Sequence, residues 1–202
     1  MSAMNLPAFT RAEPDARRLS LIEATARVLA RDGAANASVR VIAREAGVSP
    51  GLPGHYFDGI DGLIAATYEH IAERVNVALG SAIAAAGSDP RARLSAYVTA
   101  SFDPPIADPA LLATWLAFWS LVKARPAIAA LHDDIYASYR RELEQLLGAC
   151  GVAHGDLRLA AIAITALVDG LWLELCLSPQ SFTPGEARAI AERQIATLLA
   201  ET

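Results

Sequence analysis

The chain has 202 residues, of which 53% are apolar, and its formal net charge is −5. This size allows one large domain, or a small domain joined to a medium one, with a buried core. Two cysteines, Cys150 and Cys176, are too few for a disulfide framework. Residues 1–15 lack the pattern of a signal peptide, and no uncharged apolar stretch reaches the roughly 18 residues of a membrane span. We therefore expect a cytoplasmic protein without a membrane partner.

The first part of the chain predicts three helices after a disordered tail at residues 1–13. A helix is expected from about Pro14 to Arg31, because apolar residues recur there at spacings of three and four, and Gly33 should end it. Ser38 should cap a short second helix. A turn at Gly47-Val48 precedes a third helix, which the dipeptide Ser49-Pro50 is expected to open, with the serine as its cap.

The rest of the chain also predicts only helices, since alanine and leucine dominate and β-branched runs are scarce. Pro104-Pro105 should break the chain between two of them. The expected helices cover residues 59–86, 90–102, 109–123, 126–147, 156–177 and 184–200. The prediction is an all-α protein of roughly nine helices, with a head and a body that meet near Asp58.

Charge is distributed unevenly between these two parts. Residues 11–57 carry seven arginines and five acidic residues, whereas residues 58–202 carry ten basic and seventeen acidic residues. A mildly basic head on an acidic body is the polarity expected if only the head meets phosphate.

The segment from Ser38 to Phe57 predicts a helix-turn-helix. Ala43 is small and faces inward, so that two short helices can cross closely. Gly47 can adopt the left-handed conformation of the turn, and Val48 is the apolar residue between the helices. Such a unit can place its second helix in the major groove of DNA.

Residues 17–63 resemble the DNA-binding head of TetR-family repressors. The resemblance rests on IAREAGVS at 42–49, on Gly51, on the pair Tyr56-Phe57 and on Leu63. A weaker resemblance covers the body, where WLAFW at 115–119 and LVDGLW at 167–172 are similar to the choline-responsive repressors of betaine synthesis. It implies a helix-turn-helix head at residues 14–58 and a ligand-binding and dimerisation body at residues 59–202.

The resemblance also implies roles for residues of the head. Ser38, Arg40 and Arg44 would face phosphates, although without the motif a solvated face would be the better interpretation of the two arginines. Ser49 would cap the recognition helix. The residues expected at base edges are Pro50, Leu52 and His55, and Tyr56 would touch the DNA backbone.

Three residues depart from the family pattern. Pro53 and Gly54 stand where relatives have an aliphatic residue and a larger side chain, and Ile60 stands where a lysine normally binds phosphate. Proline and glycine both disfavour a helix, so we expect a recognition helix that is short, distorted or ordered only on DNA. The alternative function is a ligand-binding family member whose DNA binding is weakened or lost.

Aromatic residues in the body suggest a ligand site. Trp115, Phe118 and Trp119 share one helical face, a spacing more typical of a core than of a box for a cation. The resemblance to choline-responsive repressors adds weight to the alternative of a box, which would hold a small cationic inducer by cation–π attraction. The other candidates for this site are Tyr136, Tyr139, Asp169 and Trp172, and Tyr97 and Phe102 could also join them. Asp169 is expected to line a cavity or to bond a backbone group.

The helix expected at residues 156–177 is apolar on nearly every side, as a helix buried between two subunits would be. By the family resemblance, its stripe and part of the last helix form a two-fold homodimer interface. The residues assigned to that interface are Ala161, Ile164, Val168, Leu171, Leu175, Ile190, Ile195 and Leu198. An inducer would act by changing the separation of the two recognition helices, with the 59–86 helix carrying the shift.

An enzyme is not expected. Residues 47–51 match G-x-S-x-G, but that nucleophile elbow needs a strand and a sheet, and a helix enters here. His132-Asp133-Asp134 is far more typical of a solvated helix face than of a metal site. No phosphate-binding loop is visible, and no cofactor is expected.

Overall fold

The computed structural model describes residues 14–200, so the tail predicted for residues 1–13 lies outside the described range. Within that range the chain is all-α, as predicted, and contains no strand. The elements are α1 Pro14–Asp32, η1 Ala34–Asn36, α2 Val39–Glu45, α3 Leu52–Tyr56, α4 Gly59–Ala85, α5 Pro90–Thr99, η2 Ala100–Phe102, α6 Pro109–Val122, α7 Pro126–Ala149, α8 Leu157–Leu177 and α9 Pro184–Ala200.

Most helix boundaries follow from local chemistry that is visible in the sequence. Gly33 ends α1 with a positive φ of 72°, which a residue without Cβ adopts at little cost. The Ser38 hydroxyl accepts a hydrogen bond from the Val41 amide at 3.4 Å and so caps α2. Asp108 caps α6 through the amides of Ala110 and Leu111, both at 3.0 Å. These elements confirm the predictions for the first two helices and for the restart after Pro104-Pro105.

The start of α3 differs from the prediction. The helix begins at Leu52 rather than at Pro50, its N-cap is Gly51, and the Ser49 side chain makes no capping bond. A helix opened by Pro50 would need a backbone N–H at its fourth residue, and Pro53 has none. The later start puts Pro53 in the first turn, where no such donor is required. The prediction of a short recognition helix is correct, since α3 has only 5 residues.

The head is a small bundle around its own apolar core. Ile22 and Val28 of α1, Ile42 of α2 and Leu63 of α4 pack together in it. The first turns of α4, beyond the boundary expected at Asp58, thus complete the head.

An ion-pair cluster fastens α1 to α2. The carboxylate of Glu45 accepts hydrogen bonds from Arg27 at 3.0 Å and from Arg31 at 2.9 Å. Hydrogen bonds from Arg31 and then Arg27 lower the pKa of Glu45. All three side chains are partly or fully exposed, so this cluster orients α2 more than it stabilises the fold.

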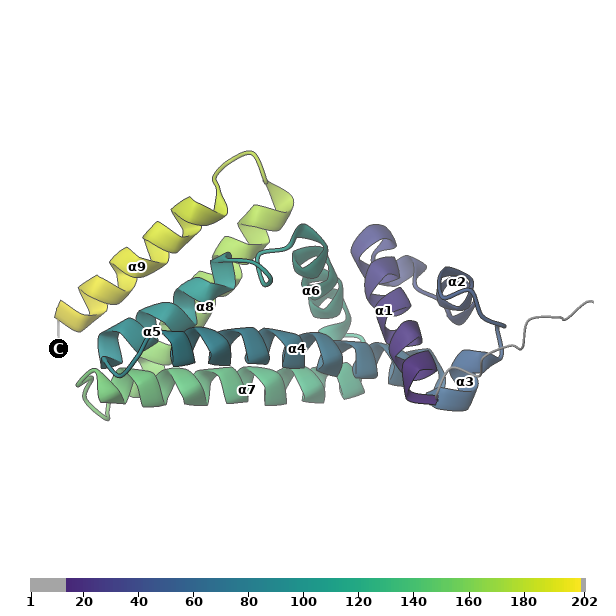
Figure 1. Ribbon diagram of the computed structural model, residues 1–202, viewed down its shortest axis with the longest axis horizontal. Coiled ribbons are helices and arrows are strands. Elements are labelled where there is room, and N and C mark those ends of the chain that lie inside the picture. Colours follow the sequence, from purple (N-terminus) through teal and green to yellow (C-terminus); the bar gives the residue numbers. More distant parts are fainter. Residues whose placement is uncertain (1–13, 201–202) are drawn as a thin grey trace, which may run out of the picture.

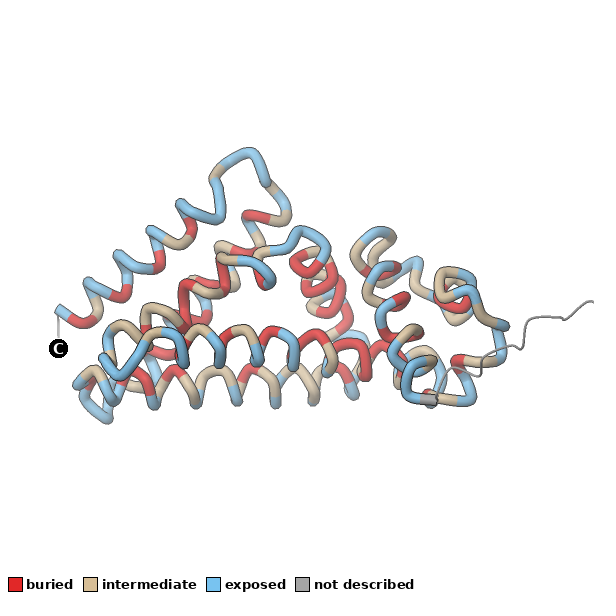
Figure 2. The backbone as a smooth tube through the Cα atoms, viewed as in Figure 1, coloured by how far each residue is buried: buried red, intermediate tan, exposed pale blue. Residues whose placement is uncertain are grey.

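The body is an elongated array of helices through which α4 runs from the head to the far end (Figure 1). α7 lies beside α4 and runs in the same direction. Asp61 of α4 forms an ion pair with Arg125 at the start of α7. About two turns further along both helices, the hydroxyl of Tyr68 lies 3.0 Å from Nδ1 of His132. α8 and α9 form an antiparallel pair on the side away from the head (Figure 1). Buried residues follow the inner faces of all these helices (Figure 2).

α6 connects the body to the head because it packs against α1. The Thr114 hydroxyl bonds the Ala110 carbonyl at 2.7 Å and also reaches the Ala26 carbonyl of α1 at 3.3 Å. The next residue, Trp115, faces the interior of the body. Two neighbouring residues of α6 therefore contact the head and the core of the body.

By length and hydropathy, α8 could cross a membrane. Its buried side, however, packs into the core of this chain through Ala161, Ile164, Val168 and Trp172. A core helix passes the same test of length and composition, and α8 is accounted for as one.

The turn between α2 and α3 offers a test of the helix-turn-helix geometry. Gly47 has a φ of 67°, and a Cβ there would meet no heavy atom within 4 Å. Gly47→Ala should therefore lower the free energy of unfolding by about 1–2 kcal/mol through backbone strain alone, measured by urea denaturation. Gly54→Ala is the matched control, since it also has open space but no positive φ, and should be neutral or stabilise by up to about 1 kcal/mol. Equal losses from both changes would contradict this account.

Candidate functional site

The residues expected to contact DNA all lie at the end of the molecule formed by α2 and α3 (Figure 1). Most of them are exposed, namely Ser38, Arg40, Arg44, Ser49, Pro50 and His55. Leu52 and Tyr56 are half-buried. The structure thus brings the predicted set together at the surface of the head.

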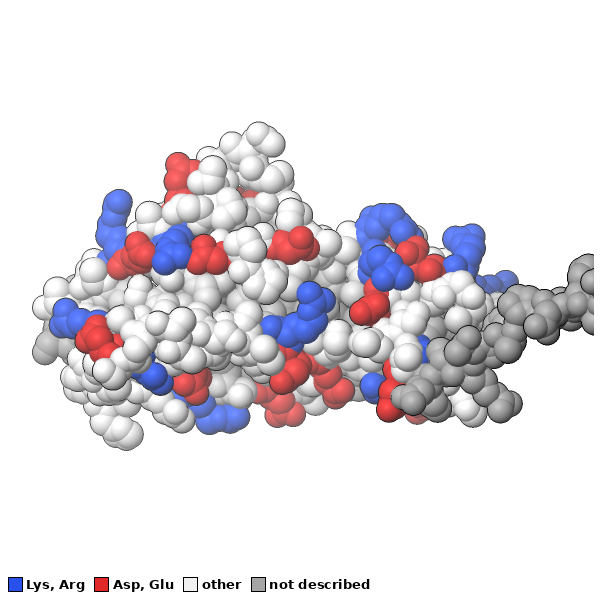
Figure 3. All heavy atoms as spheres, in the orientation of Figure 1, with Lys and Arg blue, Asp and Glu red and all other residues white. Residues whose placement is uncertain are grey.

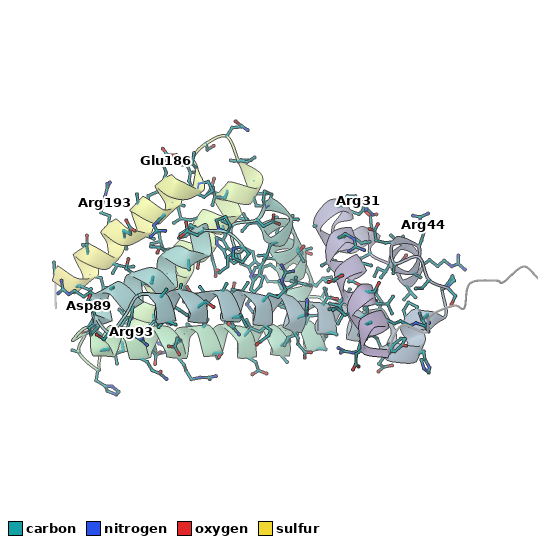
Figure 4. All side chains as sticks on the ribbon, in the orientation of Figure 1. Arg31, Arg44, Asp89, Arg93, Glu186 and Arg193 are labelled. Atoms are coloured by element: carbon teal, nitrogen blue, oxygen red, sulfur yellow. The ribbon has the colours of Figure 1, made fainter. Side chains whose placement is uncertain are left out.

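Two guanidinium groups at this end are exposed and lie outside the ion-pair cluster around Glu45. Arg40 and Arg44 form no ion pair within residues 14–200, whereas Arg31 is bound to both Asp32 and Glu45. Arg44 projects from α2 on the same side of the head as Arg31 (Figure 4). In the charge view, basic groups of the head stand at its surface beside acidic ones (Figure 3). Arg40 and Arg44 are therefore the side chains of this surface most suited to bind phosphate.

Ile60 occupies the position at which the family pattern has a phosphate-binding lysine. Its side chain is half-buried and packs against both the core of the head and the core of the body. An apolar contact between head and body therefore stands where a phosphate contact would be, and phosphate binding falls to other side chains.

A second candidate site is a cavity inside the body, walled by α4, η2, α6, α7 and α8. Its volume is about 40 Å³. Its lining residues are Ala72, Val75, Asn76, Leu79, Ser101, Trp115, Ile135, Tyr136, Tyr139, Thr165, Val168, Asp169 and Trp172. Five of the seven predicted ligand residues are among them. A cavity of this size suits a small ligand only.

The Tyr136 hydroxyl is the centre of a hydrogen-bond network in this wall. It donates to Oδ1 of Asp169 at 3.0 Å and accepts from the indole N–H of Trp119 at 3.1 Å and, more weakly, from that of Trp115 at 3.4 Å. One donor and two acceptors saturate a phenol hydroxyl. Tyr136 is thereby fixed in place, and so is the carboxylate that it binds.

Asp169 is the one carboxylate among the lining residues. Burial raises the pKa of Asp169 to about 6, while the hydrogen bond from Tyr136 and the charge of Arg140 act in the opposite direction. Of the two roles expected for Asp169, it lines the cavity, and its hydrogen-bond donor is a side chain rather than a backbone group. At neutral pH it places a negative charge in a largely apolar space.

Aromatic rings surround this charge. Trp172 meets Trp115 edge to face at 5.6 Å, and its indole N–H donates to the Ser101 carbonyl at 3.0 Å. Tyr97 stacks on Tyr139 at 5.2 Å from behind. The Tyr139 hydroxyl is buried and makes no hydrogen bond of ordinary geometry within the described residues. It lines the cavity beside Ser101, whose side-chain interaction opposes the rise in the pKa of Tyr139 that burial causes.

Phe118 and Trp119 do not line the cavity, contrary to prediction. Phe118 is fully buried and stacks on Tyr68 at 4.3 Å, so it belongs to the core. Trp119 faces an open outer groove that it shares with Lys123 and His132. One helical face carries all three aromatic residues of α6, but the cavity meets only Trp115.

Several lining or supporting residues were not predicted. Thr165 lies one turn before Asp169 on α8, so the helical spacing from Asp169 could have predicted it. Asn76 and Ser101 come from α4 and η2, and no sequence pattern connects them to α8. Tyr68 and His132 form a bridge behind the cavity wall. Burial is the largest cause that lowers the pKa of His132.

The predicted dimer stripe is wrong for five of its residues. Ala161, Ile164, Val168, Leu175 and Ile195 are buried in the core of their own chain and offer no surface to a partner. Ile190 is exposed, and Leu171 and Leu198 are half-buried.

The exposed face of α8 is a different apolar stripe at helical spacing. Its large members are Leu159, 64% exposed, Ile162, 36%, and Leu177, 62%, and Ala163, Ala166, Gly170 and the charged, exposed Glu174 lie between them. The sequence of α8 carries two apolar faces, and only the packing of the body decides which one turns inward.

No metal centre emerges, since within residues 14–200 no three His, Cys, Asp or Glu side chains are grouped to hold an ion.

Comparison with known proteins covers both parts of the chain. Residues 21–67 match the family of bacterial regulatory proteins named for tetR, and residues 90–200 match the BetI-type transcriptional repressor C-terminal domain. The HTH-type transcriptional regulator BetI of Ectopseudomonas mendocina is 36% identical over 184 residues, which are 87% of this chain and 89% of that protein. BetI of Paraburkholderia phymatum is 34% identical over 196 residues, 93% of this chain and 95% of the relative.

Solved structures agree with this result. A putative transcriptional regulator from Pseudomonas aeruginosa PAO1 is 45% identical, with a TM-score of 0.86 over 96% of this chain and 95% of its own. A putative transcriptional regulator from Saccharomonospora viridis, solved in complex with choline, shares the fold at 20% identity and a TM-score of 0.77, over 90% of this chain and 96% of that one.

The buried carboxylate predicts a pH-dependent stability. The folded state raises the pKa of Asp169 from 3.8 to about 6, so its protonation favours folding at low pH, and that contribution is lost as the pH rises through 6. Asp169→Asn keeps an acceptor for Tyr136 but does not ionise. Relative to wild type, the variant should gain about 2–3 kcal/mol of unfolding free energy between pH 4 and pH 7.5 in urea titrations. Asp134→Asn, at an exposed position of α7, is the control and should show the same difference at both pH values.

Proposed function

The chain belongs to the TetR family of transcriptional regulators, with a C-terminal domain of the BetI repressor type, and we propose that a small organic cation in the aromatic cavity releases it from operator DNA. Such a regulator acts in the cytoplasm, where it meets DNA. The observation that carries the proposal is the ionisable carboxylate of Asp169 inside a cavity walled by aromatic rings.

The chemistry of the cavity favours a cation over a neutral or anionic ligand. At pH 7 Asp169 is mostly ionised, and a buried charge needs an opposite charge or several hydrogen bonds. Among the described residues only the Tyr136 hydroxyl bonds it, Arg140 acts on it through its charge alone, and none of the residues that line the cavity is basic. The rings of Trp115, Tyr136 and Trp172 add cation–π attraction, about 0.5–2 kcal/mol for each ring that faces the charge. The choline bound to the Saccharomonospora viridis regulator is a cation of this class.

The head supplies the DNA contacts in this proposal. Arg40 and Arg44 of α2 bind phosphates, which positions the protein, and the residues around α3 meet the bases. Since α2 is held to α1 through Glu45, the arginines move with the head as one unit.

Two helices transmit the state of the cavity to the head. α6 lines the cavity with Trp115 and touches α1 with Thr114. α4 lines it with Val75 and Asn76, and its first turns lie in the core of the head. A ligand that prefers one position of these helices lowers DNA affinity by its differential binding, typically about 1–3 kcal/mol.

We infer a homodimer through the exposed apolar face of α8 and Ile190 of α9, in place of the stripe expected from the sequence. Leu159 and Leu177 stand at the two ends of that face. Apolar side chains left this exposed in a row mark a protein contact. A two-fold axis there presents two heads, as a palindromic operator requires.

A second candidate function is ligand binding without specific DNA recognition. The observation that favours it is the brevity of α3, whose 5 residues include Pro53 and Gly54. Binding of the protein to its own upstream region separates the two functions.

The ligand proposal is tested with choline and its neutral isostere 3,3-dimethyl-1-butanol by isothermal titration calorimetry. Choline should bind at least about tenfold more tightly at pH 7.5, and this preference should vanish in Asp169→Asn because the counter-charge is gone. Choline affinity should fall as the pH drops through about 6, where Asp169 takes up a proton. Equal affinities for the two compounds would rule out recognition of a cation.

The DNA proposal is tested by footprinting and fluorescence anisotropy on the region upstream of the protein's own gene. Arg40→Gln and Arg44→Gln should each weaken binding and lower the slope of log affinity against log salt by about one. Arg93→Gln is the matched control, because Arg93 lies at the far end of the body (Figure 4). If wild-type protein binds this region no better than random duplex, the second candidate function replaces the first.

A further inference from the structure

The surface that α3 presents is poor in side chains that can read bases by hydrogen bonds. Residues 46–60 contain no Arg, Lys, Asn or Gln. Those four residue types make the bidentate contacts that identify guanine and adenine in the major groove. Hydrogen-bonded recognition by α3 is therefore left to His55, beside the hydroxyls of Ser49 and Tyr56.

His55 alone specifies little. It is exposed and meets the Tyr56 ring edge to face, with ring centroids 5.2 Å apart, so its orientation is constrained. An imidazole that makes a single hydrogen bond to N7 does not separate guanine from adenine, since both purines present that acceptor.

Two glycines leave the backbone of this surface bare. Gly51 and Gly54 are exposed, and a Cβ on either would meet no heavy atom within 4 Å. At these two positions no side chain separates the backbone from a DNA groove. The side chains between and beside the glycines can therefore reach the base edges.

The side chains so placed are apolar. Pro50 is exposed, and Leu52 is half-buried at the first position of α3. Pro53 is buried and turned into the head. The one apolar group that base pairs display in the major groove is the C5-methyl group of thymine.

Resting on the proposed operator binding, we propose that this protein identifies its operator chiefly through thymine methyl groups, which Leu52 and Pro50 contact in the major groove. The arginines of α2 set the register on the phosphates but carry no sequence information. Leu52 and Pro50 are the specificity-determining residues, and each half-site holds one or two thymines whose methyl groups are read.

The experiment needs no change to the protein. Full-length protein selects duplexes from a randomised pool, and its affinity is measured on the selected duplex and on copies in which one thymine at a time is replaced by uracil. Uracil pairs as thymine does and lacks only the methyl group. One or two replacements per half-site should each weaken binding about three- to fivefold, as expected for one buried methyl group. Cytosine at such a position should bind worse than 5-methylcytosine.

Variants identify the reading residue. Leu52→Ala should abolish the difference between thymine and uracil at one position, and Pro50→Ala at the other, with melting temperatures that show the head is still folded. Val77→Ala is the matched control, an exposed apolar residue in the middle of α4, and should keep both differences.

The outcomes are distinct. Specific duplexes whose every thymine tolerates uracil overturn this inference and leave the proposed function standing. Selection of no sequence at all removes the proposed DNA-binding function and the inference with it.

Discussion

The arrangement of the body depends on one buried negative charge and the hydroxyl that holds it. The Tyr136 hydroxyl donates one hydrogen bond to Asp169 and accepts hydrogen bonds from the indole N–H groups of two tryptophans, so residues from α6, α7 and α8 meet at a single oxygen atom. Because one hydrogen bond from a neutral hydroxyl does not offset the burial of a carboxylate, the pKa of Asp169 is raised and the site favours positive charge. The proposed recognition of a cation and the predicted pH response both begin at this group.

The fold could be read from the sequence because its boundaries are set by local chemistry. Gly33, Ser38, Gly47 and Asp108 act within a few residues of where they stand. The start of α3 was misplaced because Ser49-Pro50 is a good local signal that Pro53 overrules three residues later. A helix that begins at Pro50 cannot accommodate Pro53 at its fourth position. α3 therefore begins at Leu52, which places Pro53 in the first turn.

The site was predictable only in part, since cavities form between elements that are distant in sequence. Trp115, Tyr136, Tyr139, Asp169 and Trp172 were found because aromatic and acidic residues stand out on apolar helices. Asn76 and Ser101 could not be found, because only packing brings α4 and η2 to the same space. The prediction of which face of α8 turns inward failed for the same reason. Both sides of this helix are apolar, and its sequence holds no information on which one the body covers.

The two cross-links between α4 and α7 have a mechanical consequence. The ion pair Asp61–Arg125 and the hydrogen bond Tyr68–His132 join the parallel helices α4 and α7 at two points along their length. The joined helices resist bending more than either helix would alone. α4 has 27 residues and is therefore about 40 Å long. A rigid rod of that length that pivots by about 3° at one end sweeps its other end through about 2 Å. In the proposed response to a ligand, a small molecule can thus displace the whole head without deforming any helix.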